Sequence, residues 1–122
     1  MKKPILLIID DEIGLARIMK LNLELTGEFQ VEVAYTGDEG IKKASANAYD
    51  LVITDFRMPG GMDGRAVAEA IKRLKPHCPI LLCTGDLEVD NQNPVAVDGI
   101  ISKPIDHKSL HGIITEMLAK QD

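Results

Sequence analysis

The feature of this sequence that most constrains its fold is a run of five aliphatic residues, 5–9, that ends at Asp10 and Asp11. An unbroken apolar run of this length is typical of a strand covered on both faces, as the strands of a parallel sheet are. Two adjacent carboxylates directly after a buried strand repel each other unless something positive lies beside them. The segment therefore predicts a parallel sheet and a charged site at its end.

The rest of the chain alternates between strand and helix patterns. Further strands are predicted at 30–35, 51–54, 79–83 and 99–102, and the first of these has the polar–apolar alternation of an edge strand. Apolar residues at helical spacing predict helices between the strands. The residues predicted to face inward are Leu15, Ile18, Met19 and Leu23 in the first helix, Ile41, Ala44 and Ala48 in the second, Val67, Ala70, Ile71 and Leu74 in the third, and Leu110, Ile113, Ile114, Met117 and Leu118 in the last.

Capping and turn residues mark several element ends. Thr36 followed by Glu39 is a capping-box pattern, Asp106 precedes the last helix as a cap, and Gly27 is a natural helix stop. The segment 86–97 is rich in Asn and contains Pro94, so it predicts only a short or irregular helix. Alternating strands and helices imply βαβ units, and the whole chain, 1–122, is predicted to form one doubly wound α/β domain.

Composition excludes several classes of protein. A net charge of −5 argues against nonspecific binding to nucleic acid, because contact with phosphates needs clustered Lys and Arg. The longest apolar runs are only as long as a strand, so no membrane span or signal peptide is predicted and we expect a cytoplasmic protein. Cys78 and Cys83 lie near the two ends of one predicted strand, too far apart for a disulfide, and we expect both thiols to be reduced.

Polar residues stand at the end of nearly every predicted strand. Asp10 and Asp11 follow the first strand, Asp55 the third, Thr84 the fourth and Lys103 the fifth. Because ligands of open α/β sheets bind beyond the carboxyl ends of the strands, these side chains are expected to lie together. Any one of them alone has an ordinary structural explanation, as a helix cap, a turn or a solvated lysine. The convergence of all five predicts a functional site.

The residue types at this edge suit phosphoryl transfer. Three carboxylates form a hard-oxygen site that fits Mg²⁺, which accepts one or two carboxylates, water and a substrate phosphate. Lys103 supplies a flexible cation and Thr84 a hydroxyl donor, and transfer of a phosphoryl group needs little beyond positioning and charge stabilisation. Asp55 ends a short strand and precedes a turn-rich loop, so it is the best candidate nucleophile and would form an acyl phosphate.

The segments "LLIIDDE", "LVITDFRMPGGMDG", "ILLCTGD" and "GIISKPI" together resemble a response-regulator receiver domain of the CheY-like family, and the resemblance covers essentially the whole chain. It implies a flavodoxin-like fold with strand order 2-1-3-4-5 and a cis Lys103–Pro104 bond. It also implies a phosphoprotein of two-component signal transduction, in which Asp55 is the phosphoacceptor. Thr84 and Lys103 would contact the phosphoryl group.

The same resemblance implies a Mg²⁺ site made by Asp10, Asp11, Asp55 and the backbone carbonyl of Arg57. Such a protein is not an enzyme in the ordinary sense, because it assists only its own phosphoryl transfer and hydrolysis. The chain departs from the family pattern at Ile100, where an aromatic residue usually takes part in the switch together with Thr84. The loop after Asp55 is also one residue longer than usual, and the interval from Thr84 to Lys103 is shorter.

The implied partners are a histidine kinase or histidine phosphotransfer protein and a downstream protein target, and the last helix offers a surface for a homodimer. The chain would be a stand-alone regulator, a phosphate relay, or a module excised from a larger response regulator or hybrid kinase. A further alternative is a pseudo-receiver that acts without phosphorylation; the intact acidic pocket argues against it, whereas Ile100 keeps it open. A Mg²⁺-dependent phosphohydrolase would place its nucleophile after the first strand, and a flavin module would need aromatics that this chain lacks.

Two weaker motifs have a surface explanation. His107 and His111 are one helical turn apart, a spacing that can bind a metal ion, but the sequence shows no third ligand and we expect both to be exposed. The long side chain of Arg57 either overhangs the acceptor and affects the access of water, or is an ordinary loop arginine.

Overall fold

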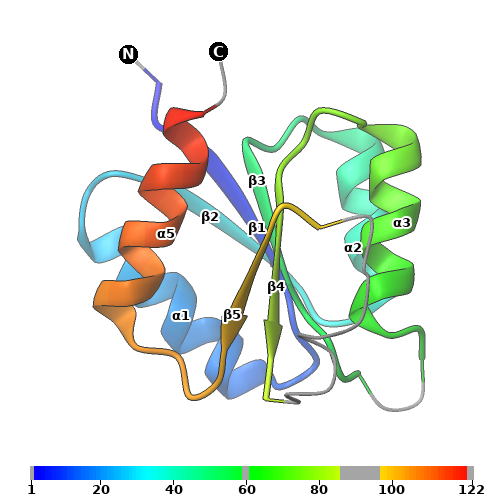
Figure 1. Cartoon of the computed structure of the whole chain (residues 1–122), viewed down its shortest axis with the longest axis horizontal. Helices are drawn as coiled ribbons and strands as arrows, with labels where there is room; N and C mark the ends of the chain where they lie inside the picture. Colours follow the sequence, from blue (N-terminus) through cyan, green and yellow to red (C-terminus); the bar gives the residue numbers. More distant parts are fainter. Residues whose placement is uncertain (1, 59–60, 86–96, 121–122) are drawn as a thin grey trace.

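The structure, a computed structural model, describes residues 2–58, 61–85 and 97–120 as a parallel sheet with helices packed on both faces (Figure 1). The strands are β1 (Ile5–Ile9), β2 (Gln30–Ala34), β3 (Leu51–Asp55), β4 (Ile80–Thr84) and β5 (Gly99–Ser102). The helices are α1 (Ile13–Leu25), α2 (Gly37–Ala46), α3 (Gly64–Leu74) and α5 (His107–Ala119). The irregular helix predicted for 86–97 falls, apart from Val97, outside the described residues.

The sheet has the order β2-β1-β3-β4-β5, and every neighbouring pair is parallel. This confirms the predicted doubly wound fold. All residues of β3 and β4 are buried, whereas β2 has exposed residues, Gln30 and Glu32, on either side of the buried Val31, as expected of an edge strand. The cis Lys103–Pro104 bond is also present, directly after β5.

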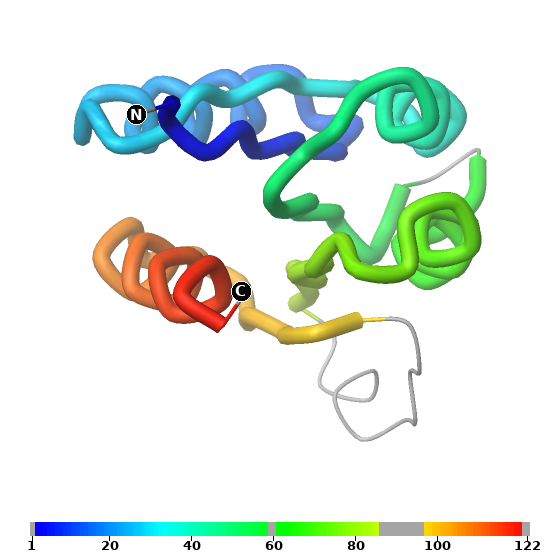
Figure 2. Tube along the Cα trace, turned by 90° about the horizontal axis from the view of Figure 1, so that it is seen from above, coloured from blue at the N-terminus to red at the C-terminus, as the bar shows by residue number. Residues whose placement is uncertain are grey.

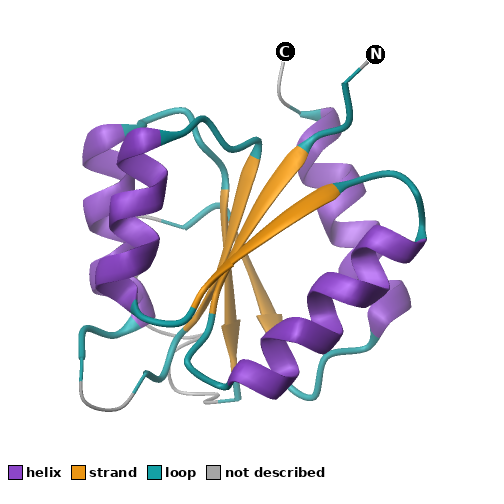
Figure 3. Cartoon of the chain, turned by 180° about the vertical axis from the view of Figure 1, so that it is seen from behind, coloured by secondary structure: helices purple, strands orange, loops and turns teal. Residues whose placement is uncertain are grey.

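Successive residues of the central strands face opposite sides of the sheet, and this divides the core into two layers. Leu6 and Ile8 pack toward α1 and α5, whereas Leu7 and Ile9 pack toward α2 and α3. Figures 2 and 3 show the two helical layers with the sheet between them. The unbroken apolar run of β1 is therefore explained by its central place in a sheet covered on both faces.

The predicted inner face of α1 is partly wrong. Met19 and Leu23 are buried as expected, but Leu15 is 50% exposed and Ile18 is 52% exposed, and Ala16 takes the remaining inward position. The helix has apolar residues around most of its circumference, so large side chains in the sequence do not identify the face that packs. The inward face is the one that carries Ala16, Met19 and Leu23, which pack in the same core layer as Leu6 and Ile8.

Two more helix predictions need correction, and one is confirmed. Ala48 lies beyond the end of α2 and is exposed, while Leu74 is the last residue of α3 and is 48% exposed. In α3 the buried small residue is Ala68, and Ala70 is only partly buried. The predicted face of α5 is confirmed, because its apolar residues are all buried or partly buried against one layer of the core.

The predicted caps are present. The Thr36 hydroxyl accepts a hydrogen bond from the Glu39 N–H at 3.0 Å, and the Glu39 carboxylate accepts from the Tyr35 N–H at 2.7 Å. The Asp106 carboxylate accepts from the Ser109 N–H at 3.1 Å. Each cap pairs backbone donors that the first turn of a helix leaves without partners.

The surface predictions for the histidines and the cysteines are mostly confirmed. His107 is exposed, but His111 is only partly exposed, because its Nε2 lies 2.6 Å from a carboxylate oxygen of Glu28 and its ring lies against Phe29. Cys78 and Cys83 are free thiols. Within the described ranges, the search for a helix long and apolar enough to cross a bilayer finds none.

Two aspartates make hydrogen bonds at the beginnings of neighbouring strands, a feature that the sequence analysis did not predict. Asp50 accepts a hydrogen bond from the Ile5 N–H at 2.7 Å and donates its own N–H to the Ile5 carbonyl at 2.8 Å. Asp98 makes the same reciprocal pair with Ile80, at 2.8 Å for each bond. Both residues precede a strand by one position and close the ladder where it begins.

Replacing Asp50 by alanine is expected to lower the free energy of unfolding by about 1 kcal/mol, because the Ile5 N–H loses its partner. Urea unfolding at neutral pH measures this change. Asp50→Asn is the matched control, since the amide oxygen still accepts the hydrogen bond and should keep most of the stability. An Asp50→Ala variant with an unchanged unfolding midpoint would contradict the proposed role of this hydrogen bond.

Candidate functional site

The carboxyl ends of the strands are aligned by backbone hydrogen bonds that continue one residue past the sheet. The Asp10 N–H donates to the Ala34 carbonyl at 3.0 Å, and the Lys103 N–H donates to the Thr84 carbonyl at 2.9 Å. The Phe56 N–H donates to the Cys83 carbonyl at 2.9 Å, which fixes the residue after Asp55. The sheet therefore holds the predicted polar residues at one edge through their own backbone.

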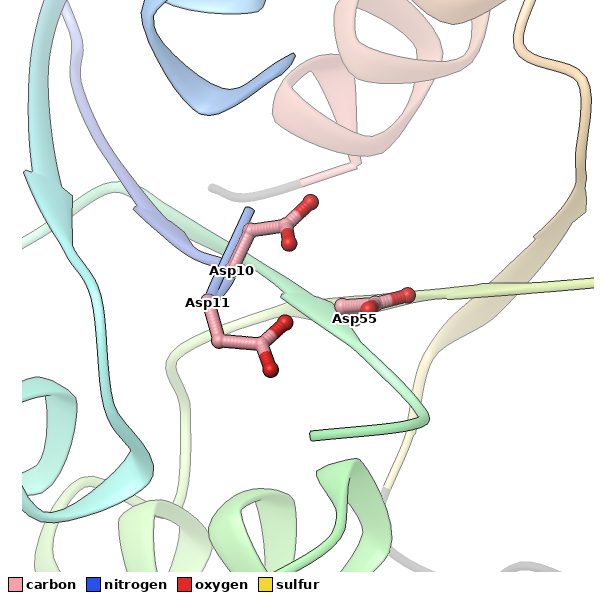
Figure 4. A group of neighbouring side chains, drawn as sticks. All are labelled: Asp10, Asp11 and Asp55. Atoms are coloured by element: carbon pink, nitrogen blue, oxygen red, sulfur yellow. The ribbon is translucent and has the colours of Figure 1, made fainter. Parts of the chain in front are cut away.

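Three carboxylates meet at this edge, as the sequence predicted. One oxygen each from Asp10, Asp11 and Asp55 lie within 4.8 Å of one another. Figure 4 shows the three side chains projecting to the same side of the strand ends that hold them. Asp10 and Asp55 are buried, at 6% and 5% exposed, whereas Asp11 is nearer to solvent. A site with two buried acids and one open side can admit a ligand from solvent.

Lys103 forms the positive side of the site. Its Nζ lies 2.6 Å from Oδ1 of Asp55, and about a third of its side chain, 31%, is exposed. Burial alone would lower the pKa of Lys103, but the hydrogen bond and the charge of Asp55, with the charge of Asp10, outweigh burial and raise the pKa. The ammonium group is therefore charged at neutral pH and neutralises part of the acidic cluster.

One lysine does not balance three carboxylates, and Asp10 reflects this imbalance. Burial is the largest cause that raises the pKa of Asp10, and the charge of Asp55 raises it further. The hydrogen bond from the Glu12 N–H to Oδ1 of Asp10, 2.9 Å long, and the charge of Lys103 act in the opposite direction without cancelling the rise. The ionised form of Asp10 is thus disfavoured mainly by its burial, and the charge of Asp55 adds to this.

The donor set fits a small divalent cation. Carboxylate oxygens are the ligands that Mg²⁺ prefers, and a cation among these three would favour the ionised form of Asp10, which burial and the charge of Asp55 disfavour. Among the described residues, this is the one group of three or more Asp, Glu, His or Cys side chains close enough to share a metal ion.

The remaining predicted residues, Thr84, Arg57 and Ile100, differ in their exposure to solvent. Thr84 ends β4 and is buried, at 2% exposed. Arg57 is exposed, and its guanidinium carbon lies 5.9 Å from the centroid of the Phe56 ring. Ile100 lies in the edge strand β5, pairs in register with Leu82 and is partly exposed.

Three neighbours of Asp55 were missed by the sequence analysis. Cys83 pairs in register with Asp55, and burial, with the charge of Asp55, raises the pKa of its thiol to about 12. Thr54 is fully buried and its hydroxyl donates to the Asp55 carbonyl at 3.1 Å. Gly64 begins α3 directly beside the same carbonyl. The only feature of the sequence that could have pointed to Gly64 is its position immediately after Asp63, the cap of α3.

Comparison with known proteins places this geometry in a family. The family model of the response regulator receiver domain matches residues 6–115. Among curated relatives, the response regulator ArlR of Staphylococcus saprophyticus is 33% identical over 121 residues, which cover 95% of this chain and 53% of that protein. The transcriptional regulatory protein GlrR of Escherichia coli K12 is 31% identical over 116 residues, covering 93% of this chain and 26% of the relative. The chain thus spans about half or less of these relatives.

Solved structures agree with the sequence comparisons. A CheY-like receiver domain protein from Methanospirillum hungatei JF-1 is 31% identical with a TM-score of 0.89, and the match covers 98% of this chain and 97% of the other. The response regulator TrrA of Thermotoga maritima, solved in complex with Mg²⁺ and BeF, is 29% identical with a TM-score of 0.85 and covers 93% and 98% of the two chains. With its fold, its acidic site and these matches, the chain belongs to the family of response regulator receiver domains of two-component systems.

Proposed function

We propose that this chain is a phosphorylation-driven switch in which Asp55 accepts a phosphoryl group from a histidine kinase or a histidine phosphotransfer protein. The observation that carries the proposal is the surrounding of the Asp55 carboxylate, with Lys103 at 2.6 Å on one side and two further carboxylates within 4.8 Å. This arrangement supplies a nucleophile, a fixed cation and a set of ligands for a metal ion. A solved relative that holds Mg²⁺ and BeF supports the same assignment.

In the proposed reaction, a carboxylate oxygen of Asp55 forms a bond to phosphorus while the bond from phosphorus to the donor's imidazole nitrogen breaks. The product on this chain is an acyl phosphate, and the donor leaves as a neutral histidine after taking up a proton. Lys103 stabilises the negative charge on the transferred group, and the Thr84 hydroxyl donates a hydrogen bond to it. Hydrolysis of the acyl phosphate by water returns Asp55 to its starting state, so the chain assists its own reaction and turns over no separate substrate.

Asp10, Asp11 and Asp55 would hold Mg²⁺ together with the backbone carbonyl of Arg57. The ion, when bound, supplies positive charge that offsets the oxygens of the transferring phosphoryl group. The protein's own part is to keep these ligands in place, and the backbone bonds at the ends of β1 and β3 do so.

The output of the switch is proposed to lie on the face that contains Thr84, Ile100 and α5. Thr84 and Ile100 belong to adjacent strands, β4 and β5, and Ser102 pairs with Thr84 in register. A downstream protein, or a second copy of the chain, would recognise this face after phosphorylation. The free thiols support action in the reducing cytoplasm, and the greater length of the curated relatives supports a module of a longer regulator.

Incubation with Mg²⁺ and acetyl phosphate is expected to add one phosphoryl group to the intact protein, because the acid cluster is complete. Intact mass spectrometry measures this gain. Asp55→Asn and a chelator should each abolish it, because they remove the nucleophile and the cation respectively. No gain in mass with acetyl phosphate or with a cognate kinase, although Mg²⁺ binds, would favour the pseudo-receiver alternative.

Replacing Asp10 by asparagine is expected to raise the free energy of unfolding of the metal-free protein by about 1 kcal/mol, because a carboxylate whose charge is disfavoured by burial and by Asp55 becomes neutral. The asparagine oxygen can still accept the Glu12 N–H. The same change should weaken Mg²⁺ binding by about tenfold or more, because a charged ligand is lost. Thermal unfolding and calorimetric titration measure the two effects. The control is Glu69→Gln, which neutralises an exposed carboxylate on α3. If Asp10→Asn lowered the free energy of unfolding of the metal-free protein, the prediction would be refuted.

Replacing Ile100 by tyrosine is expected to leave the labelling of Asp55 intact and to alter partner binding or dimerisation, because it restores an aromatic ring on the proposed output face. Ile100 is partly exposed, so β5 can accommodate the ring. Mass spectrometry measures the rate of labelling, and light scattering measures the oligomeric state, each with and without a phosphodonor. Ile100→Val is the control. Loss of labelling in the tyrosine variant would show that this position supports the chemistry itself.

A further inference from the structure

The backbone carbonyl of Asp55 is contacted from two sides by residues outside the acidic cluster. On one side the hydroxyl of Thr54 donates a hydrogen bond to it at 3.1 Å. Thr54 is fully buried, so its hydroxyl cannot exchange this bond for one with bulk water. On the other side lies the first residue of α3, Gly64.

The absence of a side chain at Gly64 is what allows this second contact. A Cβ atom there would overlap with the Asp55 carbonyl oxygen, and it would lie 2.8 Å from Cδ1 of Leu82 and 2.9 Å from the Cα of Phe56. Two of these three atoms belong to the backbone, which cannot turn aside as a flexible side chain can. The residue is also fixed from its own side, because the Gly64 N–H donates to the Phe56 carbonyl at 2.8 Å.

The start of α3 is held firmly enough to act as a support. The Asp63 carboxylate accepts from the Ala66 N–H at 3.0 Å and caps the helix. Val67, one turn into α3, is fully buried in the core layer that also contains Ile9 and Val52. The helix start and strand β3 are thus both anchored, and the Asp55 carbonyl lies between them.

We propose that Thr54 and Gly64 are positioning residues for phosphoryl transfer: together they fix the peptide after Asp55 and so set the direction of its carboxylate. This inference rests on the proposed function of Asp55. The same peptide leads to Phe56 and then to Arg57, whose carbonyl is a proposed Mg²⁺ ligand. Both the nucleophile and the metal site therefore depend on the placement of a single carbonyl group.

The expected size of the effect follows from how sensitive such sites are to geometry. Reacting groups need placement within about 0.5 Å, and a displacement of about 1 Å can slow a reaction by about 100-fold. Relieving the overlap in Gly64→Ala requires a backbone shift of a comparable size. We expect phosphorylation to slow by about tenfold or more, and Mg²⁺ to bind more weakly.

Substitutions at Thr54 test the role of the same carbonyl group without placing an additional atom against it. Thr54→Val keeps the shape and removes the hydroxyl, and we expect labelling to slow severalfold. Thr54→Ser keeps the hydroxyl and is expected to restore the wild-type rate, although it removes a methyl group from the core. A merely structural role predicts the reverse order, because the valine fills the site better than the serine does.

The experiment measures labelling by acetyl phosphate across a range of donor concentrations, Mg²⁺ affinity by calorimetry and thermal unfolding, on the same protein samples. Gly61→Ala is the control for an added methyl group, because no described residue other than its chain neighbours has an atom within 4 Å of its new Cβ. Asp50→Ala is the control for lost stability, because it removes a hydrogen bond at the opposite end of β3 from Asp55.

The expected result is a lower maximal rate and weaker Mg²⁺ binding for Gly64→Ala and Thr54→Val, with wild-type behaviour for Thr54→Ser, Gly61→Ala and folded Asp50→Ala. If Gly64→Ala does not fold, the comparison of Thr54→Val with Thr54→Ser tests the inference by itself. Wild-type rates and Mg²⁺ affinity in Thr54→Val would overturn the inference while leaving the proposed function in place. Failure of the wild-type protein to be labelled by acetyl phosphate or a cognate kinase would instead remove the proposed function on which the inference rests.

Discussion

The burial of two carboxylates, Asp10 and Asp55, beside a third, Asp11, is the constraint on which the rest of this structure depends. Three carboxylates within 4.8 Å of one another, two of them buried, persist only if the backbone that carries them cannot move apart. Lys103 offsets one charge at 2.6 Å, and the central strands β1 and β3 supply the rigidity. The unfavourable arrangement makes the site receptive to a cation, because binding one releases energy that folding has stored.

The sheet edge and its polar residues could be predicted from the sequence, because apolar runs have a simple meaning. Each run ends where a strand leaves the core, and parallel strands end at one edge, so Asp10, Asp55 and Lys103 had to lie near each other. The order of the strands in the sheet came from the family resemblance instead. Periodicity alone does not say which strand lies beside which.

The inward faces of the helices and the support of Asp55 were harder to predict. Leu15 and Ile18 belong to a helix that is apolar on nearly all sides, so the pattern could not show that Ala16 faces the sheet. The roles of Thr54 and Gly64 depend on one carbonyl group that lies between a strand and a helix start. The contact between the Asp55 carbonyl and Gly64 joins residues nine positions apart and has no periodic signature in the sequence.

The reciprocal pairs made by Asp50 and Asp98 lie at the opposite ends of the strands from the acidic site. A strand of five residues spans about 16 Å, which is far enough for substitutions at the two ends to act independently. The hydrogen bonds that close the beginnings of β1 and β3, and those between Asp98 and β4, are therefore spatially separated from the acidic site. A lineage could change the residues of the site at one end of the sheet and compensate for lost stability at the other, and an engineer could reinforce the distal end without altering the acidic cluster.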